Sequence, residues 1–428
     1  MRILPVLLLM VGCQANVPAT SLRAASFDDE INGPVKEAAG GEAASLVELY
    51  TWFHTNAELS LKEEKTSAKF ASEVRAAGWT VTEKIGGYGV VGVLKNGEGP
   101  TILLRIDMDG LPVKEETGLP YASTSGAMHA CGHDSHLAMG IGIARLLSKL
   151  RDRWAGTVIL VGQPAEEIVR GARMMLEDPK FKEAIPSTPA ACLSVHDFPG
   201  LAGTVGVCPG FASANTDSLD IRIFGHGGHG AWPQKTVDPI VIASELVLSL
   251  QTIVSRKLAP GTRAVVTVGS FHSGTKHNVI PNEAMLQLTV RSYEADVREK
   301  LLSEIKHIAE AVAEVHHAPK KPELTLVDSC PAGYHDPALS ERMIGVFERL
   351  LGKDRVTREE PVMGGEDFGL FAKHFGVPGL QFRVGGAKPN HDPEVGLHSS
   401  RWAVDPEPTL RTGTAAFARA CLDLLRKK

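Results

Sequence analysis

The sequence has few clustered basic residues. Apart from the terminal Arg426-Lys427-Lys428, neither lysine nor arginine forms a long run, and the 428-residue chain carries a formal net charge of -5. Because a nucleic-acid-binding surface needs a basic patch, the sequence gives no electrostatic indication of nucleic-acid binding. Internal repeats are also missing, and the length favours two domains rather than one.

The apolar run at the N-terminus is too short to cross a membrane. It covers residues 3–11, whereas a spanning helix needs roughly 20 apolar residues. One arginine before the run and Gly12-Cys13 after it give the layout of an export signal. Residues 10–13, MVGC, resemble a bacterial lipobox, in which cleavage leaves the cysteine as a lipid-bearing N-terminus. The alternative is a plain secretory signal that is cut before Thr20.

We therefore expect an exported protein, a periplasmic or cell-surface lipoprotein of a bacterium. Its signal peptide would cover residues 1–12, and Cys13 would carry the lipid. The following segment is rich in alanine, glycine, serine and acidic residues without periodicity. This composition predicts a flexible tether over residues 13–45.

Cysteine is scarce, with six in the chain. In an oxidising compartment a structural disulfide is feasible, and Cys192 and Cys208 are the closest candidates in sequence. Spacing alone does not settle the pairing.

Short apolar runs alternate with helical patterns from residue 46 onward. The runs cover residues 90–94, 101–106, 157–161 and 191–195. A helix is predicted over residues 136–150. Strands rich in Val, Ile and Leu that are separated by helices predict an α/β fold, with a parallel or mixed sheet covered on both faces.

The pattern changes near residue 213. The stretches DSLDIRIFG, AVVTVGSFHSG and AMLQLTVRSY alternate with a period of two, and helices are predicted over residues 238–257 and 294–316. With ELTLVDS as the last strand, the order is that of a ferredoxin-like α+β domain. We predict that this domain, residues 213–328, is inserted into a larger one formed by residues 46–212 and 329–428.

Three apolar runs are each followed directly by polar residues. The pairs are Asp107 and Asp109, Glu166 and Glu167, and His196 and Asp197. Because ligands of open parallel sheets bind at the carboxyl ends of the strands, the three pairs together indicate one site. Each pair also has an ordinary explanation, since adjacent glutamates usually lie in solvated turns and a histidine after a strand is often structural.

The stretch MHACGHDSH, residues 128–136, combines one cysteine, three histidines and an aspartate. Cys131 and His133 open the predicted helix, and a helix N-terminus favours the thiolate that a metal requires. Three roles for Cys131 are open at this point: nucleophile, disulfide partner and metal ligand.

These motifs together resemble the amidohydrolase branch of the M20 metallopeptidase family, which includes hippurate hydrolases, N-acyl amino acid hydrolases and auxin-conjugate hydrolases. The resemblance runs from about residue 46 to the C-terminus. The motifs that carry it are ELSLKEEKTS, RIDMDGLPV, MHACGHDSH, PAEE, GHGGHGAWP, NVIPNEA, GGEDF and LHSS. It implies a zinc-exopeptidase-like sheet with the inserted domain as a lid and dimerisation domain.

The resemblance also implies a site for two divalent metal ions. The ligands would be Cys131, His133, Glu167, His196 and His398. A thiolate can bridge two metals, so the resemblance favours the ligand role for Cys131. Zinc, manganese, cobalt and nickel all suit such a mixed donor set, and ligand type does not choose among them.

The family pattern assigns roles to further residues. Glu166 would be the general base, which takes a proton from the attacking water and passes it to the leaving amine. Asp107 and Asp134 would hold ligand histidines. In the lid, His229 would stabilise the oxyanion, often from a partner subunit, and Asn278 would contact the substrate.

Arg291 has two open interpretations, a receptor for a substrate carboxylate and a solvated arginine at a strand end.

We expect a metal-dependent amidohydrolase that cleaves the amide bond of N-acyl or N-aroyl amino acids, with a homodimer through the lid as in some relatives. One alternative is a metallo-carboxypeptidase or dipeptidase on the same scaffold. Another is a cysteine amidase with Cys131 as the nucleophile. A binding protein that has lost catalysis is a third, although all five ligand positions and Glu166 are present.

Overall fold

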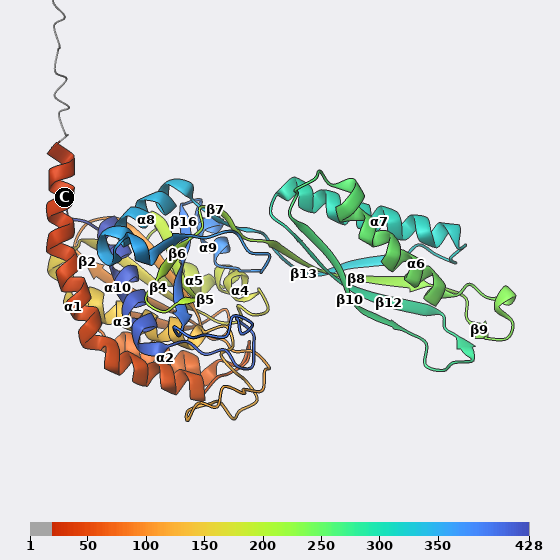
Figure 1. The fold of residues 1–428 in the computed structure, drawn as a ribbon, viewed down its shortest axis with the longest axis horizontal. Coiled ribbons are helices and arrows are strands. Elements are labelled where there is room, and N and C mark those ends of the chain that lie inside the picture. Colours follow the sequence, from red (N-terminus) through yellow and green to blue (C-terminus); the bar gives the residue numbers. More distant parts are fainter. Residues whose placement is uncertain (1–18, 428) are drawn as a thin grey trace, which may run out of the picture.

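A mixed eight-stranded sheet forms the centre of the larger part of the molecule (Figure 1). The computed structural model describes residues 19–427, so the predicted signal peptide and Cys13 lie outside the described residues. In spatial order the strands are β1 (Thr80–Ile85), β2 (Gly89–Asn96), β4 (Gly156–Gln163), β3 (Thr101–Asp107), β5 (Ala191–Leu201), β16 (Gly379–Ala387), β6 (Val205–Val207) and β15 (Val356–Arg358). Strands β4, β3, β5 and β16 run parallel to their neighbours in this series, which confirms the predicted fold class.

Helices cover both faces of this sheet because its central strands are apolar on both sides. All seven residues of β3 are buried, and Leu103 and Leu104 belong to hydrophobic clusters on opposite faces. One face carries α1 (Ala19–Thr55), α2 (Glu64–Ala76), α3 (His133–Lys149), α8 (Pro337–Leu351) and α10 (Pro406–Leu424). The other carries α4 (Gly171–Glu177), α5 (Pro179–Ala184) and α9 (Gly369–Phe375). Single 3-10 turns are η1 (Arg151–Arg153) and η4 (Lys353–Arg355).

Helix α1 corrects one prediction. The sequence predicts a flexible tether over residues 13–45, but the described part of this segment is helical. Ile31, Val35 and Ala39 recur every four residues, are buried and join the main hydrophobic core. The tether prediction is wrong over these residues because the interspersed glycines and Pro34 obscure the helical spacing.

The smaller part of the molecule is the inserted domain, called the lid below. It is a four-stranded antiparallel sheet with two helices (Figure 1). Its strand order is β10-β12-β8-β13. Its elements are β8 (Asn215–Phe224), α6 (Pro239–Thr252), η3 (Ile253–Lys257), β10 (Ala264–Ser273), β12 (Glu283–Ser292), α7 (Ala295–Val315) and β13 (Glu323–Cys330). This is the ferredoxin-like order that the sequence predicts.

Two small antiparallel pairs lie outside the two larger sheets. β9 (Gly228–His229) pairs with β11 (Val279–Ile280), and η2 (Pro233–Lys235) follows β9. Figure 1 places β9 at the end of the lid far from the large sheet. The second pair, β7 (Gly210–Ser213) with β14 (Gly333–His335), lies where the chain passes between the two parts.

One helix among the described residues, Pro239–Lys257, is long and apolar enough to cross a membrane by length and composition alone. Its buried residues Ile242, Leu246 and Leu250 pack into the core of the lid. We therefore assign the segment to the lid.

Candidate metal centre

The carboxyl ends of the parallel strands bring the predicted polar residues to one edge of the large sheet. Asp107 is the last residue of β3, Glu166 and Glu167 follow β4, and His196 lies within β5. Because these strands are parallel neighbours, their carboxyl ends face the same way. Helix α3 begins at this edge with His133 and thereby adds Cys131 just before it.

Four of the predicted ligands lie close together. Ligand atoms of Cys131, His133 and Glu167 all lie within 4.8 Å of one another. The Cys131 Sγ lies 3.6 Å from His196 Nε2. A sulfur, two imidazole nitrogens and a carboxylate are a mixed donor set that suits zinc and related divalent metals.

Backbone carbonyl groups fix which nitrogen of each ligand histidine is free. His133 Nδ1 donates to the carbonyl oxygen of Asp109 at 2.9 Å, and His196 Nδ1 donates to that of Asp197 at 2.6 Å. In the neutral form of each ring, this arrangement leaves Nε2 as an acceptor, which is the state that a metal ligand needs.

Two buried atoms in the cluster lack a hydrogen-bond partner in the described chain. They are His133 Nε2 and Glu167 Oε1, which lie 3.8 Å apart. A buried polar atom without a partner costs free energy unless something else binds it. The residues therefore fit a bound cation.

His398 is the fifth predicted ligand and the most exposed. Its Nε2 lies 3.5 Å from Glu167 Oε2, and its side chain is 56% exposed. The backbone at His398 has a positive φ of 68°, and its N–H donates to the carbonyl oxygen of Ala130 at 2.7 Å. The histidine thus stands at the open side of the cluster, and the strained backbone is typical of functional sites.

The electrostatic environment inside the cluster favours protonated acids. Burial, and then the neighbouring Glu167 carboxylate, raise the pKa of the Cys131 thiol well above its usual range. The expected thiolate-favouring effect of the helix N-terminus is therefore outweighed, and a cation is needed to hold a thiolate here. Burial, and then Glu366, likewise raise the pKa of Glu166 well above its usual range.

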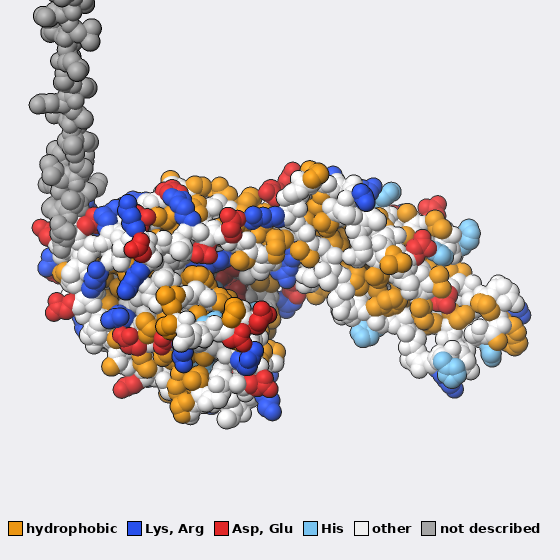
Figure 2. Space-filling model, viewed as in Figure 1, with side chains coloured by type: hydrophobic (Ala, Val, Ile, Leu, Met, Phe, Trp, Pro, Cys, Tyr) orange, Lys and Arg blue, Asp and Glu red, His pale blue; other side chains and the backbone are white. Residues whose placement is uncertain are grey.

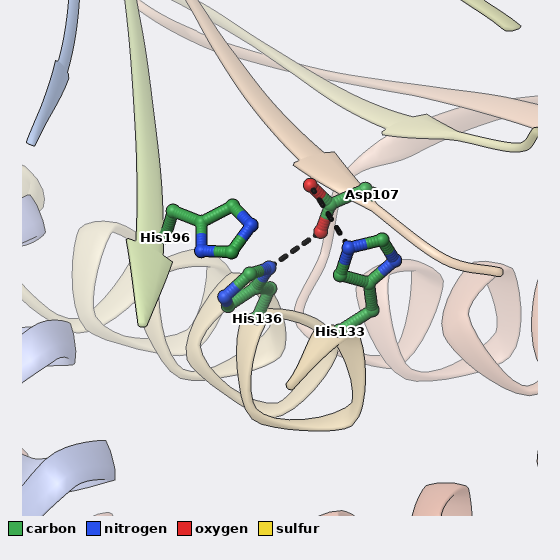
Figure 3. Close-up of side chains that lie close together, drawn as sticks. All are labelled: Asp107, His133, His136 and His196. Carbon is green, nitrogen blue, oxygen red and sulfur yellow. Dashed lines mark hydrogen bonds and ion pairs between the residues drawn. The ribbon is translucent and has the colours of Figure 1, made fainter. Parts of the chain in front are cut away.

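His136 is a member of the site that sequence reasoning missed (Figure 3). Its Nδ1 lies 2.5 Å from Asp107 Oδ1, and its Nε2 lies 3.0 Å from Asp197 Oδ1. Its ring also packs against that of His196 at a centroid distance of 4.6 Å. The available signal was its position three residues after His133, on the same helix face.

The structure changes the roles predicted for two aspartates. Asp134 bonds His54 at 2.6 Å rather than a ligand histidine, so that prediction is wrong. Asp107 bonds His136, and its other oxygen lies 3.8 Å from His133 Nε2. Asp134 is the second residue of α3, directly after His133. Its side chain bonds His54 near the end of α1 instead of a residue of the metal cluster.

The sequence also does not predict a role for Arg105, because this residue lies inside a strand whose neighbouring residues are mostly apolar. Its guanidinium is fully buried and pairs with three carboxylates. The partners are Asp107 at 2.6 Å, Glu366 at 2.9 Å and Asp367 at 3.0 Å. This ion network holds the segment of residues 364–368, which contains Glu366 and Asp367, against the end of β3.

A cavity of about 550 Å³ opens beside the cluster and reaches the lid. Cys131, Glu166 and His398 line it on one side, and Arg291 of β12 lines it on the other. Arg291 is half-buried, and burial lowers its pKa. Apolar lining comes from Phe198, Val169, Val362 and Leu397.

The structure does not bring His229 and Asn278 to this cavity. Both are exposed at the far end of the lid, where the N–H of Gly230 donates to the Asn278 carbonyl at 2.9 Å. Neither lines the cavity. Figure 2 shows histidines exposed at this end of the molecule. Within one chain, these two residues are apart from the metal cluster.

The five cysteines in the described part of the chain are all free thiols. Cys192 and Cys208 are therefore not joined. Both are buried, and burial raises the pKa of each thiol.

Comparison with known proteins identifies relatives over nearly the whole chain. The model of peptidase family M20/M25/M40 matches residues 103–423. YhaA of Bacillus subtilis, described as a candidate amidohydrolase, is 35% identical over 380 residues, which are 88% of this chain and 94% of YhaA. The IAA-amino acid hydrolase ILR1-like 2 of Arabidopsis thaliana is 33% identical over 402 residues, which are 90% of this chain and 88% of the plant protein.

Solved structures share the fold. YXEP of Bacillus subtilis, described as a dinuclear metal-binding peptidase from the M20 family, superimposes with a TM-score of 0.74 at 29% identity. The match covers 90% of this chain and 99% of YXEP.

Proposed function

The chain belongs to peptidase family M20/M25/M40 and is a metal-dependent amide hydrolase, and within this class we propose that it cleaves N-acyl and N-aroyl amino acids. The products would be a carboxylic acid and an amino acid. The observation that carries the proposal is the Cys131–His133–Glu167 cluster, which lies beside one further carboxylate, Glu166, at the wall of a cavity. The plant relative, named as a hydrolase of an amino acid conjugate, supports the substrate class.

We propose that Cys131, His133, Glu167, His196 and His398 hold two divalent cations. The description of YXEP as dinuclear and metal-binding supports the number of metals. When bound, such cations act as Lewis acids that activate water and polarise the amide carbonyl. Zinc, manganese, cobalt and nickel remain equal candidates, because ligand type does not separate them.

Glu166 is the proposed general base. Its carboxylate lies 3.8 Å from His133 Nε2 and lines the cavity, so it can reach both the cluster and a bound substrate. It would take a proton from the attacking water and deliver it to the leaving nitrogen. Burial raises the pKa of Glu166 well above its usual range, and bound cations nearby would favour the carboxylate form that accepts the proton.

The cavity lining supports an acylated amino acid as the substrate. Arg291 presents a guanidinium that can bind a carboxylate through two parallel hydrogen bonds. Phe198 and Leu397 provide apolar surface for an acyl or aryl group.

Activity of the purified protein on N-acyl amino acids tests this function. We expect N-benzoyl-glycine to be hydrolysed, the activity to be lost on chelation and regained with added divalent metal. The Glu166→Gln variant should lose on the order of 100-fold or more in turnover while keeping its metal. The exposed Glu183→Gln is the matched control. Near wild-type turnover by Glu166→Gln would refute the base assignment.

A second candidate function is a carboxypeptidase. Thermostable carboxypeptidase 2 of Saccharolobus solfataricus is 32% identical over 390 residues, which are 89% of this chain and 96% of that protein. Rates on N-benzoyl-glycine and on dipeptides with a free amine separate the two. Faster cleavage of the dipeptides would favour the second function.

We also propose a homodimer through the lid, in which His229 and Asn278 of one subunit act at the cavity of the other. Two features support it. Strand β10 is at an edge of the lid sheet, and the outer face of α6 exposes Val241 and Leu248, the latter by 72%. Light scattering should give a dimer mass for the wild type and a monomer for Leu248→Glu. A monomeric wild type with full activity would refute the dimer.

Export and lipidation of Cys13 are further proposals, which rest on residues 1–13 of the sequence. Mass spectrometry of the protein from membranes of a bacterial host should find an acylated Cys13 as the first residue. A Cys13→Ser variant should leave the membrane fraction. Release of the unmodified wild type in soluble form would point to a plain secretory signal.

A further inference from the structure

The turn that carries Glu166 and Glu167 has a strained backbone. Ala165 and Val169 both have positive φ, 53° and 49°, although neither is glycine. Side chains, and β-branched ones above all, disfavour this region. The turn is closed by the N–H of Val169, which donates to the carbonyl oxygen of Glu166 at 2.6 Å. Such a conformation persists only where surrounding contacts hold it.

Three successive backbone N–H groups of this turn donate to buried carboxylates. The Glu166 and Glu167 groups donate to the two oxygens of Asp109, each at 3.1 Å. The Ala165 group donates to Glu63 Oε1 at 2.8 Å. Glu63 therefore holds the residue whose backbone is strained and which precedes the proposed base.

Glu63 has no evident role in its own helix. Its side chain makes no capping hydrogen bond to α2, although its backbone is at the start of that helix. It is fully buried, and its Oε2 has no hydrogen-bond partner among the described residues. Burial, and then the nearby Asp109 carboxylate, raise the pKa of Glu63 to about 7. Folding alone does not favour a carboxyl group in such a place.

We propose that Glu63 is a positioning residue, whose hydrogen bond to the Ala165 N–H holds the strained turn and so places the Glu166 carboxylate for proton transfer. The proposal rests on the proposed function, because it takes Glu166 as the base. Misplacing a reacting group by about 1 Å can lower a rate on the order of 100-fold. The contact therefore affects turnover through Glu166, and because Glu167 lies on the same turn it also bears on metal content.

Three variants at residue 63 test the hydrogen bond. Glu63→Gln keeps an acceptor oxygen, and Glu63→Leu removes it at similar volume. Glu63→Asp shortens the side chain by one methylene group, which moves the carboxylate away from the Ala165 N–H. We expect kcat to fall about 10- to 100-fold in the Leu and Asp variants and to stay within about threefold of wild type in the Gln variant. The KM should change less than about twofold in all three, and kcat is expressed per metal-loaded site because Glu167 lies on the same turn. Exposed Glu64→Gln is the control.

Crystal structures of the variants provide a readout that does not depend on activity. Ala165 should leave the left-handed region and Glu166 should shift in the Leu variant, whereas the turn should stay in place in the Gln variant. If the Leu variant does not fold, the Asp and Gln variants decide. An unmoved turn with wild-type kcat, or equal losses for Gln and Leu, would overturn the proposal. A displaced turn together with a fully active Glu166→Gln would instead refute the proposed base.

Discussion

At the residue scale, the sequence identifies the metal ligands more readily than the residues that support them. Cys131 and His133 lie in one dense motif, and donor types alone indicate metal chemistry. Arg105 gives no such signal, and the helix position of His136 is a weak one, because a buried arginine in an apolar run and a third histidine have many other uses. Their roles depend on partners that are distant in sequence, such as Glu366.

The buried guanidinium of Arg105 leads to a prediction about stability. Replacing it by methionine would leave three buried carboxylates without their cation, and losing one partner of a buried ion network typically costs about 3–5 kcal/mol. Urea denaturation of Arg105→Met should show a loss of this size. Arg222→Met, at an exposed arginine that lies 4.0 Å from Glu283, should change the unfolding free energy by less than about 0.5 kcal/mol. Similar values for the two variants would contradict the network.

His54 leads to a prediction about pH. Burial lowers its pKa, but hydrogen bonds to Asp134 and Glu115 outweigh burial and raise it to about 10. A histidine with a raised pKa stabilises the fold fully below its unfolded value near 6.5, and this contribution is lost as the pH rises towards 10. The unfolding free energy of the wild type should therefore fall more steeply between these values than that of His54→Gln. Parallel curves would show that His54 is not charged in the folded protein.

At the element scale, long buried strands were predictable, and the first helix was not. Continuous apolar runs such as residues 101–106 have few alternatives to a central strand, and β3 covers that run. The sequence predicts a tether over residues 13–45 because alanine, glycine, serine and acidic residues dominate it without periodicity. Packing of Ile31, Val35 and Ala39 on the main core decides their structure instead.

The packing of α1 predicts the effect of a truncation in its first half. Ile31 is 2% exposed, so Ile31→Ala should destabilise the protein by about 2–4 kcal/mol in urea denaturation. Exposed Glu37→Ala is the control, with little expected change. If both variants matched the wild type, the segment would be a tether after all.

At the scale of the whole molecule, one chain holds the metal cluster apart from the far end of the lid. His229 is exposed at the far end of the lid, so its proposed role requires a second subunit. Sequence motifs assign His229 a role, but they carry no information on which chain supplies it.

Mixed dimers test this arrangement. His229→Ala and Glu166→Gln should each be nearly inactive alone. When the two are co-expressed, each mixed dimer has one site with an intact Glu166 and an intact His229 from the other subunit, so roughly a quarter of wild-type activity should return. No recovery in dimers shown to be mixed would mean that His229 acts within its own subunit, whereas wild-type activity of His229→Ala alone would place it outside the reaction.

X-ray absorption at the zinc edge tests the central claim most directly. The zinc-loaded wild type should show a sulfur neighbour at about 2.3 Å, with nitrogen and oxygen ligands, and this sulfur should disappear in Cys131→Ser. Cys208→Ser should leave the spectrum unchanged. A fully active, zinc-loaded protein without any sulfur neighbour would contradict the assignment of Cys131 as a metal ligand.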